Sequence, residues 1–223
     1  MLVYNRVRRR ARLALSAHPR RTLAAVGRRL PRDALSLLGL LLSGCDLIKG
    51  KPSFKSIDIT GAEYARELSL KDPSGRVRSL AEFKGQVVLV FFGYTQCPDV
   101  CPSTLAEVAE IRRSLGEDGR RMHTLFVSLD PARDTPTVLQ AYAENFGEGV
   151  TALTGSEEEV RAAAKSFKVF FSQVPGKSAD TYTLDHTAGT YVFDPHGRVR
   201  LFSRYGAPAA GLAEDIRALL KGA

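Results

Sequence analysis

Two cysteines, Cys97 and Cys101, lie four positions apart in the stretch "FFGYTQCPDVCPSTLAEVAEI". The apolar residues before them predict a buried strand and the pattern after them predicts a helix, so both thiols fall at the amino end of that helix. Such a position lowers a thiol pKa, and a spacing of four brings two side chains to one helix face. Two converging thiolates suit Cu(I) or Zn(II). The pair therefore predicts a soft-metal site or a redox-active dithiol.

A structural disulfide is the simplest alternative for the two cysteines. Exported proteins use close cysteine pairs as staples. A bridge over so short a loop stabilises little, because the stabilisation grows with loop length. The metal or redox interpretation is therefore favoured.

A site with two thiolates needs a third ligand, and the chain has four histidines. His18 lies in the basic N-terminal segment, His123 opens a predicted strand, and His196 lies in the turn "DPHG". His186 differs, because "YTLDHTAGTYVF" places it just before a late strand that can reach the sheet edge bearing the thiols. We predict His186 as the third ligand. Asp185 beside it is a weaker candidate for a partner that orients the imidazole.

The segment "FVSLDPARDTP" places polar residues after another predicted strand, at the same sheet edge. Asp130, Arg133 and Asp134 could contact the metal site, with Asp130 as a weak supporting group, or contact a docking partner. A simpler interpretation is a strand–loop–helix connection in which Asp134 or Thr135 caps the helix. The capping interpretation is favoured, so these residues stay outside the predicted ligand set.

The elements around these motifs predict an α/β fold with a central mixed sheet flanked by helices and an N-terminal hairpin, in a single domain. The hairpin is expected at 68–80, with its turn at 72–75. Strands are expected at 86–92, 123–129, 150–153, 190–193 and 199–205. Helices are expected from about 102, at 135–147, at 156–167 with a capping box, and at 212–221.

The N-terminal segment carries most of the charge of the protein. Residues 1–45 contain ten Arg and one Asp, so a chain of net charge +8 is close to neutral beyond them. A basic nucleic-acid-binding face is therefore not supported. The Arg-rich stretch precedes a short apolar run at 34–42 and then "SGC" ending at Cys45, the order of an export signal.

The ending "LLSGC" resembles a bacterial lipoprotein box, which implies a lipoprotein-type signal at 1–45, lipidation of Cys45 and a tether at 46–66. The apolar run is too short to cross a bilayer, which needs about 20 residues. The expected location is the bacterial cell membrane, lipid-anchored and facing the periplasm or extracytoplasmic space. A buried helix with an unrelated cysteine is the alternative.

Three motifs together resemble one family. "GYTQCPDVCPSTL", "FVSLDPARDTP" and "YTLDHTAGTYVFDPHG" are similar, in order, to the Sco/SenC family of copper-binding assembly factors for cytochrome c oxidase. The resemblance runs from Leu68 to the C-terminus. It implies a thioredoxin-like domain at 67–223 that binds copper as Cu(I), with Cu(II) left open. The implied ligands are Cys97, Cys101 and His186.

The resemblance also implies a function, which is to deliver copper to the binuclear site of cytochrome c oxidase or to reduce the cysteines of that site. Implied partners are the copper-site subunit, a thiol reductant or another copper chaperone, and the membrane through the lipid anchor; no nucleic acid is expected. The resemblance thus implies a metallochaperone rather than an enzyme, with thiol–disulfide reductase activity left open. We further expect Val174–Asp185 to be a mobile loop that carries His186 to the metal.

Two rival functions remain. Thioredoxin-like thiol–disulfide oxidoreductases typically use a Cys-x-x-Cys spacing and a cis-proline before the strand that faces the thiols, whereas Gly189 and Thr190 occupy that place here. A thiol peroxidase needs an activated thiolate with polar groups around the peroxide, and no separate motif supports one.

Overall fold

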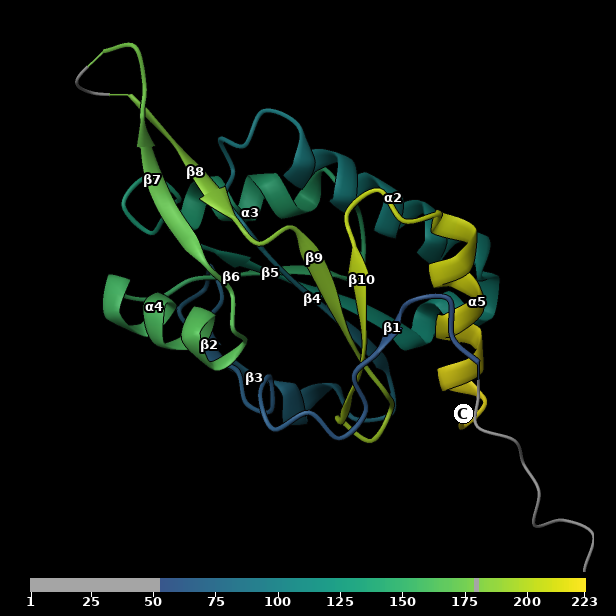
Figure 1. Ribbon diagram of the computed structural model, residues 1–223. Coiled ribbons are helices and arrows are strands. Elements are labelled where there is room, and N and C mark those ends of the chain that lie inside the picture. The colour runs from purple at the N-terminus through teal and green to yellow at the C-terminus, as the bar shows by residue number, and fades with distance from the viewer. Residues whose placement is uncertain (1–52, 179–180) are drawn as a thin grey trace, which may run out of the picture. The chain divides into compact units, whose positions relative to one another are not determined.

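The computed structural model describes residues 53–178 and 181–223, with the element labels of Figure 1. The predicted export signal, Cys45 and His18 lie outside the described residues. Among the residues described, none of the helices combines the length and the apolar character that a bilayer crossing needs.

A six-stranded mixed sheet forms the centre of the domain (Figure 1). Strand β4 lies in its interior, and all seven of its residues are buried, as the continuous apolar run predicted. It pairs in parallel with β5 and antiparallel with β9. Strand β6 extends one side in parallel, and β10 and β1 extend the other side antiparallel. The strands, in sheet order, are β1 (Ile57–Asp58), β10 (Val199–Arg204), β9 (Gly189–Phe193), β4 (Val87–Gly93), β5 (Met122–Ser128) and β6 (Val150–Leu153).

Helices cover both faces of this sheet. The successive parallel pairs β4–β5 and β5–β6 need right-handed crossovers, which place α2 and α3 on the same face. Helix α5 packs beside α2 there (Figure 1), and the α3 ring of Tyr142 lies 5.3 Å from that of Phe126. Phe92 points the other way and meets Phe167, which follows α4, at 5.0 Å. The helices are α2 (Val100–Ser114), α3 (Pro136–Glu144), α4 (Glu157–Ser166) and α5 (Ala209–Leu220), with 3-10 helices η1 (Leu80–Phe83) and η2 (Gly116–Arg121).

The mixed α/β fold and the N-terminal hairpin confirm the predicted fold class. Strands β2 (Ser69–Lys71) and β3 (Val77–Ser79) pair around the expected turn. Thr135 caps α3 by accepting a hydrogen bond from the N–H of Val138, and Ser156 and Glu159 form the expected capping box of α4. Local signals therefore located most elements to within a few residues.

Half of the segment predicted as a mobile loop, Val174–Asp185, instead belongs to two paired strands. Strands β7 (Phe171–Pro175) and β8 (Tyr182–His186) form an antiparallel hairpin that lies outside the six-stranded sheet. The prediction was wrong because Pro175 and Gly176 were taken as loop markers, whereas they stand at the turn end of a regular ladder. The short strands carried no clear alternation of their own.

The segment predicted as a tether, 46–66, is described from residue 53, and from there it belongs to the domain. Ile57 and Asp58 add an edge strand to β10, and the N–H groups of Lys55 and Ser56 donate to the Asp215 carboxylate at 2.8 and 2.7 Å. The prediction missed these contacts because they depend on residues far along the chain.

Candidate metal centre

The cysteines lie where the central strand gives way to its helix. Strand β4 ends at Gly93, a short loop carries Cys97, and α2 begins at Val100. Cys101 lies in the first turn of α2 and is completely buried, whereas Cys97 is partly exposed. The Cys101 backbone N–H donates to Cys97 Sγ at 3.4 Å. The spacing of four thus places both sulfurs at the helix entrance, as predicted.

Both cysteines are free thiols in the structure. The staple alternative therefore finds no support in the geometry of the pair.

Gly93 makes room for the buried sulfur. A Cβ added there would lie 2.6 Å from Cys101 Sγ, and 3.0 and 3.1 Å from the rings of Phe126 and Phe91. Real Cβ atoms do not approach so closely, so the strand needs glycine at this position. Sequence reasoning missed this residue, although a glycine that ends a fully apolar strand just before the cysteines was the available signal.

His186 approaches the thiols from the other part of the chain, as predicted. It is the last residue of β8, and its Nε2 lies 3.7 Å from Cys101 Sγ. Its Nδ1 lies 3.2 Å from the Thr187 carbonyl oxygen, which can only accept, so Nδ1 carries the proton and Nε2 has a free lone pair. The rings of Phe91 and Tyr94 stand edgewise to the imidazole.

The partner that orients the imidazole differs from the prediction. The Thr187 carbonyl occupies the role that was assigned to the Asp185 carboxylate, and Asp185 is exposed. The negative charge of Asp185 acts to raise the pKa of His186, but burial has the larger effect and lowers it. The carboxylate failed as a candidate because neighbours along a strand point to opposite faces.

The three ligand atoms lie within 4.8 Å of one another, and in the described residues they form the one group of this kind. For a metal in trigonal geometry with a sulfur at about 2.3 Å and a nitrogen at about 2.0 Å, the two donors stand about 3.7 Å apart. The observed separation of Cys101 Sγ and His186 Nε2 is 3.7 Å. Two sulfurs and one neutral imidazole are a donor set for a soft ion such as Cu(I).

Burial controls the protonation of both inner ligands. It raises the pKa of the Cys101 thiol well above its ordinary value, despite the hydrogen bond from the Tyr94 backbone. The expectation that the helix N-terminus lowers the pKa of this thiol is therefore wrong for Cys101, because desolvation outweighs the dipole. Burial also lowers the pKa of His186, which keeps the imidazole neutral. A metal must therefore displace a proton from Cys101 but none from Nε2 at neutral pH.

The chain is similar to known proteins. The family model described as SCO1/SenC matches residues 58–221. The chain belongs to this family. It is 37% identical to an SCO2-like protein of Rickettsia felis, over 59% of the chain and 65% of that protein. It is 38% identical to the mitochondrial SCO2 homolog of Bos taurus, over 67% of the chain and 56% of that protein. The chain thus spans well under two thirds of the length of the bovine protein and slightly under two thirds of the other.

Solved structures of the same family have the same fold. The structure of Bradyrhizobium japonicum ScoI with copper bound matches with a TM-score of 0.62 and 35% identity, over 69% of this chain and 97% of that one. Apo Sco1 from Thermus thermophilus matches with a TM-score of 0.67 and 34% identity, over 76% and 99%. Yeast Sco1 with copper bound matches with a TM-score of 0.64 and 29% identity, over 77% and 91%. The thioredoxin-like fold expected for the Sco/SenC family is therefore confirmed.

The loop after β5 supports the cysteine side of this family's site. Asp134 is buried, and its carboxylate accepts hydrogen bonds from the backbone N–H and hydroxyl of Thr95 and from the Ser128 hydroxyl. Thr95 lies two residues before Cys97. Asp134 therefore holds the cysteine loop in place and does not cap α3. Thr135 is the N-cap of that helix.

The same loop supports the histidine side. Asp130 is buried; it pairs with Arg133 and accepts a hydrogen bond from the Tyr182 hydroxyl at 2.7 Å. Tyr182 opens β8, the strand that ends at His186. The Asp130 carboxylate is therefore not a ligand, and it supports the site only through the hairpin. The loop "DPARDTP" therefore holds both the cysteine loop and the histidine hairpin.

The remaining described histidines do not reach the thiols. His123 stacks on Phe83 at 4.5 Å and hydrogen-bonds Thr151 within the sheet. The His196 N–H donates to Asp194 in its turn. His123 is therefore a structural residue of the sheet, and His196 lies in its turn, as the sequence indicated.

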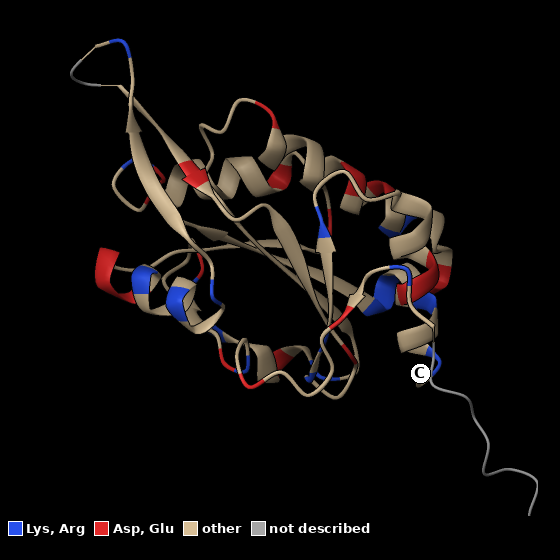
Figure 2. Cartoon of the chain, viewed as in Figure 1, with Lys and Arg blue, Asp and Glu red and all other residues tan. Residues whose placement is uncertain are grey.

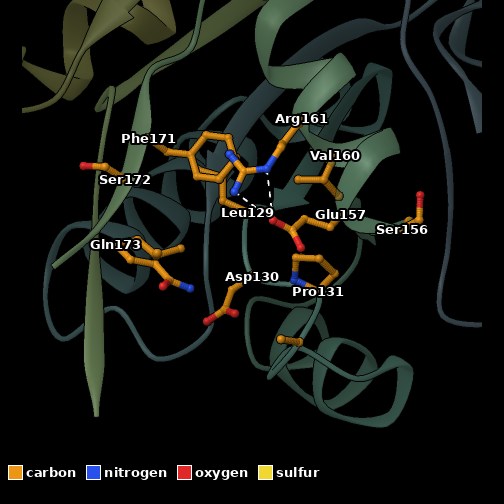
Figure 3. A pocket seen from close by; sticks show the side chains of 13 residues that line it. Leu129, Asp130, Pro131, Ser156, Glu157, Val160, Arg161, Phe171, Ser172 and Gln173 are labelled. Atoms are coloured by element: carbon orange, nitrogen blue, oxygen red, sulfur yellow. Dashed lines mark hydrogen bonds and ion pairs between the residues drawn. The ribbon is translucent and has the colours of Figure 1, made fainter. Parts of the chain in front are cut away.

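A cavity of about 420 Å³ lies beside the loop that follows β5. Figure 3 shows Asp130 and Pro131 on one wall, the α4 residues Glu157 and Arg161 joined by an ion pair, and Phe171 of β7 opposite. The metal ligands do not line it. The cavity is therefore separate from the cluster of sulfurs and imidazole.

Proposed function

We propose that this protein is a membrane-anchored copper chaperone that uses Cys97, Cys101 and His186 to bind copper for cytochrome c oxidase assembly. One observation carries the proposal: three soft or borderline donors from two distant parts of the chain lie within 4.8 Å of one another. The copper bound in B. japonicum ScoI and in yeast Sco1 supports the identity of the ion. The domain proposed to bind it comprises residues 67–223 together with the described residues 53–66, which join the central sheet through β1.

The oxidation state proposed for the delivered copper is Cu(I), because two thiolates and one imidazole favour the softer ion; Cu(II) is left open. The acceptor is the copper-site subunit of cytochrome c oxidase. Cys97 is the more exposed sulfur, so an incoming thiolate would reach the copper from that side. Ligand exchange then transfers the ion without any need to open the core around Cys101.

The decisive experiment is metal analysis combined with X-ray absorption on the purified full chain loaded with Cu(I). One copper per chain with two sulfur neighbours and one nitrogen neighbour is expected. Loading with a different stoichiometry, or copper surrounded by oxygen and nitrogen alone, would exclude the proposed ligand set.

Reduction of cysteines in the acceptor is a second candidate function, favoured by the unequal exposure of the two thiols. A Cys97 thiolate can attack a disulfide of the partner, and the buried Cys101 can then release the mixed disulfide as an intramolecular bridge. The partner gains two thiols and this protein becomes oxidised, so a separate thiol reductant must supply the two electrons that restore its own thiols. Disulfide reduction by the metal-free protein, lost in a Cys97→Ser variant, would support this function.

The proposed anchor is a lipid on Cys45, after removal of the signal, with the domain facing the periplasm or extracytoplasmic space. The support is the order of basic, apolar and small residues before Cys45. A Cys45→Ala variant should lose labelled-lipid incorporation and leave the membrane fraction. Retention of both in that variant would contradict the proposal.

A further inference from the structure

Arg133 lies between the two halves of the metal centre and touches both. Its Nη1 donates to the Gln96 side-chain oxygen at 3.2 Å and to the Tyr182 carbonyl oxygen at 2.9 Å. Gln96 immediately precedes Cys97, and Tyr182 begins the strand that ends at His186. One nitrogen therefore joins the cysteine loop to the histidine hairpin.

Further contacts fix the guanidinium in place. Its charge pairs with the buried carboxylate of Asp130, which also accepts the Tyr182 hydroxyl. Its plane lies over the Tyr182 ring, with 3.5 Å from the guanidinium carbon to the ring centroid. Tyr182 is thus engaged through its carbonyl, its hydroxyl and its ring, and a stacked planar cation is a geometry that lysine cannot reproduce.

Tyr182 and His186 are coupled along β8. They lie four positions apart, so their side chains leave the same face of the strand. The β7–β8 hairpin makes its strand pairing only within itself. Its position relative to the central sheet therefore depends on its short link to β9, on the packing of Leu184 in the core and on side-chain contacts such as those of Arg133.

We propose that Arg133 is a positioning residue that sets the separation between His186 and the two cysteine sulfurs. It does not touch the copper, and it acts through Tyr182 on one side and Gln96 on the other. This inference rests on the proposed function, because it assigns to Arg133 the assembly of that site from its two parts.

The test is an Arg133→Gln variant of the full chain, loaded with Cu(I) and examined by X-ray absorption and by competition with a Cu(I) chelator. We expect the two sulfur neighbours to remain and the nitrogen contribution to fall. The Cu(I) affinity should drop by about 10–100-fold, as for other groups that orient a metal ligand. Arg133→Lys, which keeps the charge but not the stacked fork, should recover only part of the loss.

Arg161→Gln is the matched control. The Arg161 guanidinium also contacts the hairpin, over the Phe171 ring at 5.1 Å, and it pairs with Glu157, but it makes no contact with the cysteine loop. We expect unchanged copper coordination in this variant. An equal loss of nitrogen in Arg161→Gln would show that any loosening of the hairpin suffices, and would overturn the role of Arg133.

A milder variant covers the case in which Arg133→Gln does not fold. Tyr182→Phe removes only the hydroxyl donated to Asp130, and it should weaken Cu(I) binding by about 3–10-fold, the effect of one hydrogen bond. Normal coordination and affinity in a folded Arg133→Gln variant, or in Tyr182→Phe where Arg133→Gln does not fold, would refute the inference and leave the proposed function standing. A wild-type protein without sulfur and nitrogen neighbours around copper would refute the proposed function itself.

Discussion

The two halves of the metal centre are built in different ways. The cysteines stand between β4, which is buried along its whole length, and α2, which packs against the central sheet. The histidine stands on a two-stranded hairpin outside that sheet, fastened by Asp130, Arg133 and Tyr182. A rigid dithiol and a separately docked imidazole together make a site whose third ligand can be weakened without dismantling the other two.

The ion pairs of the domain differ in how exposed they are. Figure 2 shows acidic and basic segments interspersed around the helices of the domain, with no extended stretch of one sign in this view. The ion pairs of Arg113, Arg120 and Arg161 are exposed and contribute little to stability. The Arg133–Asp130 and Arg200–Asp194 pairs are mostly buried, and of these two the Arg133–Asp130 pair lies beside the metal centre, so it is the one expected to matter for the position of the hairpin.

Loss of either sulfur should have the largest effect. In Cys97→Ser or Cys101→Ser a hard hydroxyl replaces a thiolate, and we expect Cu(I) affinity to fall by at least about 1,000-fold, or about 4 kcal/mol. Competition with a chelator measures the Cu(I) affinity, and Ser103→Ala on the same helix is the control. Near-normal affinity in either cysteine variant would remove the dithiol from the site.

Loss of the imidazole should cost less, because the rigid dithiol remains. His186→Ala is expected to lower Cu(I) affinity by about 100-fold, or about 2.8 kcal/mol, and to leave two sulfur neighbours in X-ray absorption. The structural histidine provides the control, since His123→Gln should bind copper normally. If His186→Ala proved as damaging as the cysteine variants, the two halves would not be separable.

Overpacking beside the buried sulfur tests the rigidity of the cysteine side. Gly93→Ala would force a Cβ to within 2.6 Å of Cys101 Sγ, and we expect a loss of up to about 3 kcal/mol of unfolding free energy together with weaker copper binding. Denaturant titration measures the loss of unfolding free energy. Gly211→Ala is the matched control, because its Cβ would meet only the exposed side chain of Lys55, at 3.0 and 3.3 Å. Equal costs in the two variants would mean that the strand around Gly93 yields easily.

Acid should destabilise the protein through His123 in the sheet, separately from the metal centre. Burial, with lesser contributions from Arg78 and Arg112, lowers the His123 pKa from 6.5 to about 4. The unfolded chain therefore takes up this proton below pH 6.5 while the folded chain resists it, so stability falls as the pH drops from 6.5 toward 4. At pH 5 the contribution is about 2 kcal/mol.

Denaturant titrations of wild type and His123→Gln at pH 7 and pH 5 isolate this effect, because His186 titrates in both proteins. The wild type should lose about 2 kcal/mol more than the variant between the two pH values. A parallel decline in both proteins would show that His123 is not held neutral by the fold.

Several features could be predicted because their causes are local. The apolar run of β4, the capping box of α4 and the turn at 72–75 each depend on neighbouring residues, and the cysteine spacing determines how both sulfurs meet the helix entrance. His186 was predicted from its place before a late strand, although its contact with Cys101 spans 85 positions along the chain.

Other features could not be predicted, most of them because they depend on long-range contacts. Residues 53–66 were taken for a tether, because their strand β1 pairs with β10, far along the chain. The hairpin β7–β8 was taken for a loop for a different reason, since its pairing is local but its short strands carry no clear alternation. The roles of Asp130 and Asp134 also escaped prediction, since their partners Tyr182 and Thr95 lie 52 and 39 positions away.

The sequence by itself determined the two thiols, their spacing and the strand and helix that carry them, because short-range periodicity and steric preference act between near neighbours. Only the tertiary structure decided how deeply Cys101 is buried, which group orients His186 and how the hairpin is fastened to the sheet. Desolvation and long-range hydrogen bonds exist only once the chain has brought distant residues together, and at this site they outweigh the local effect of the helix dipole.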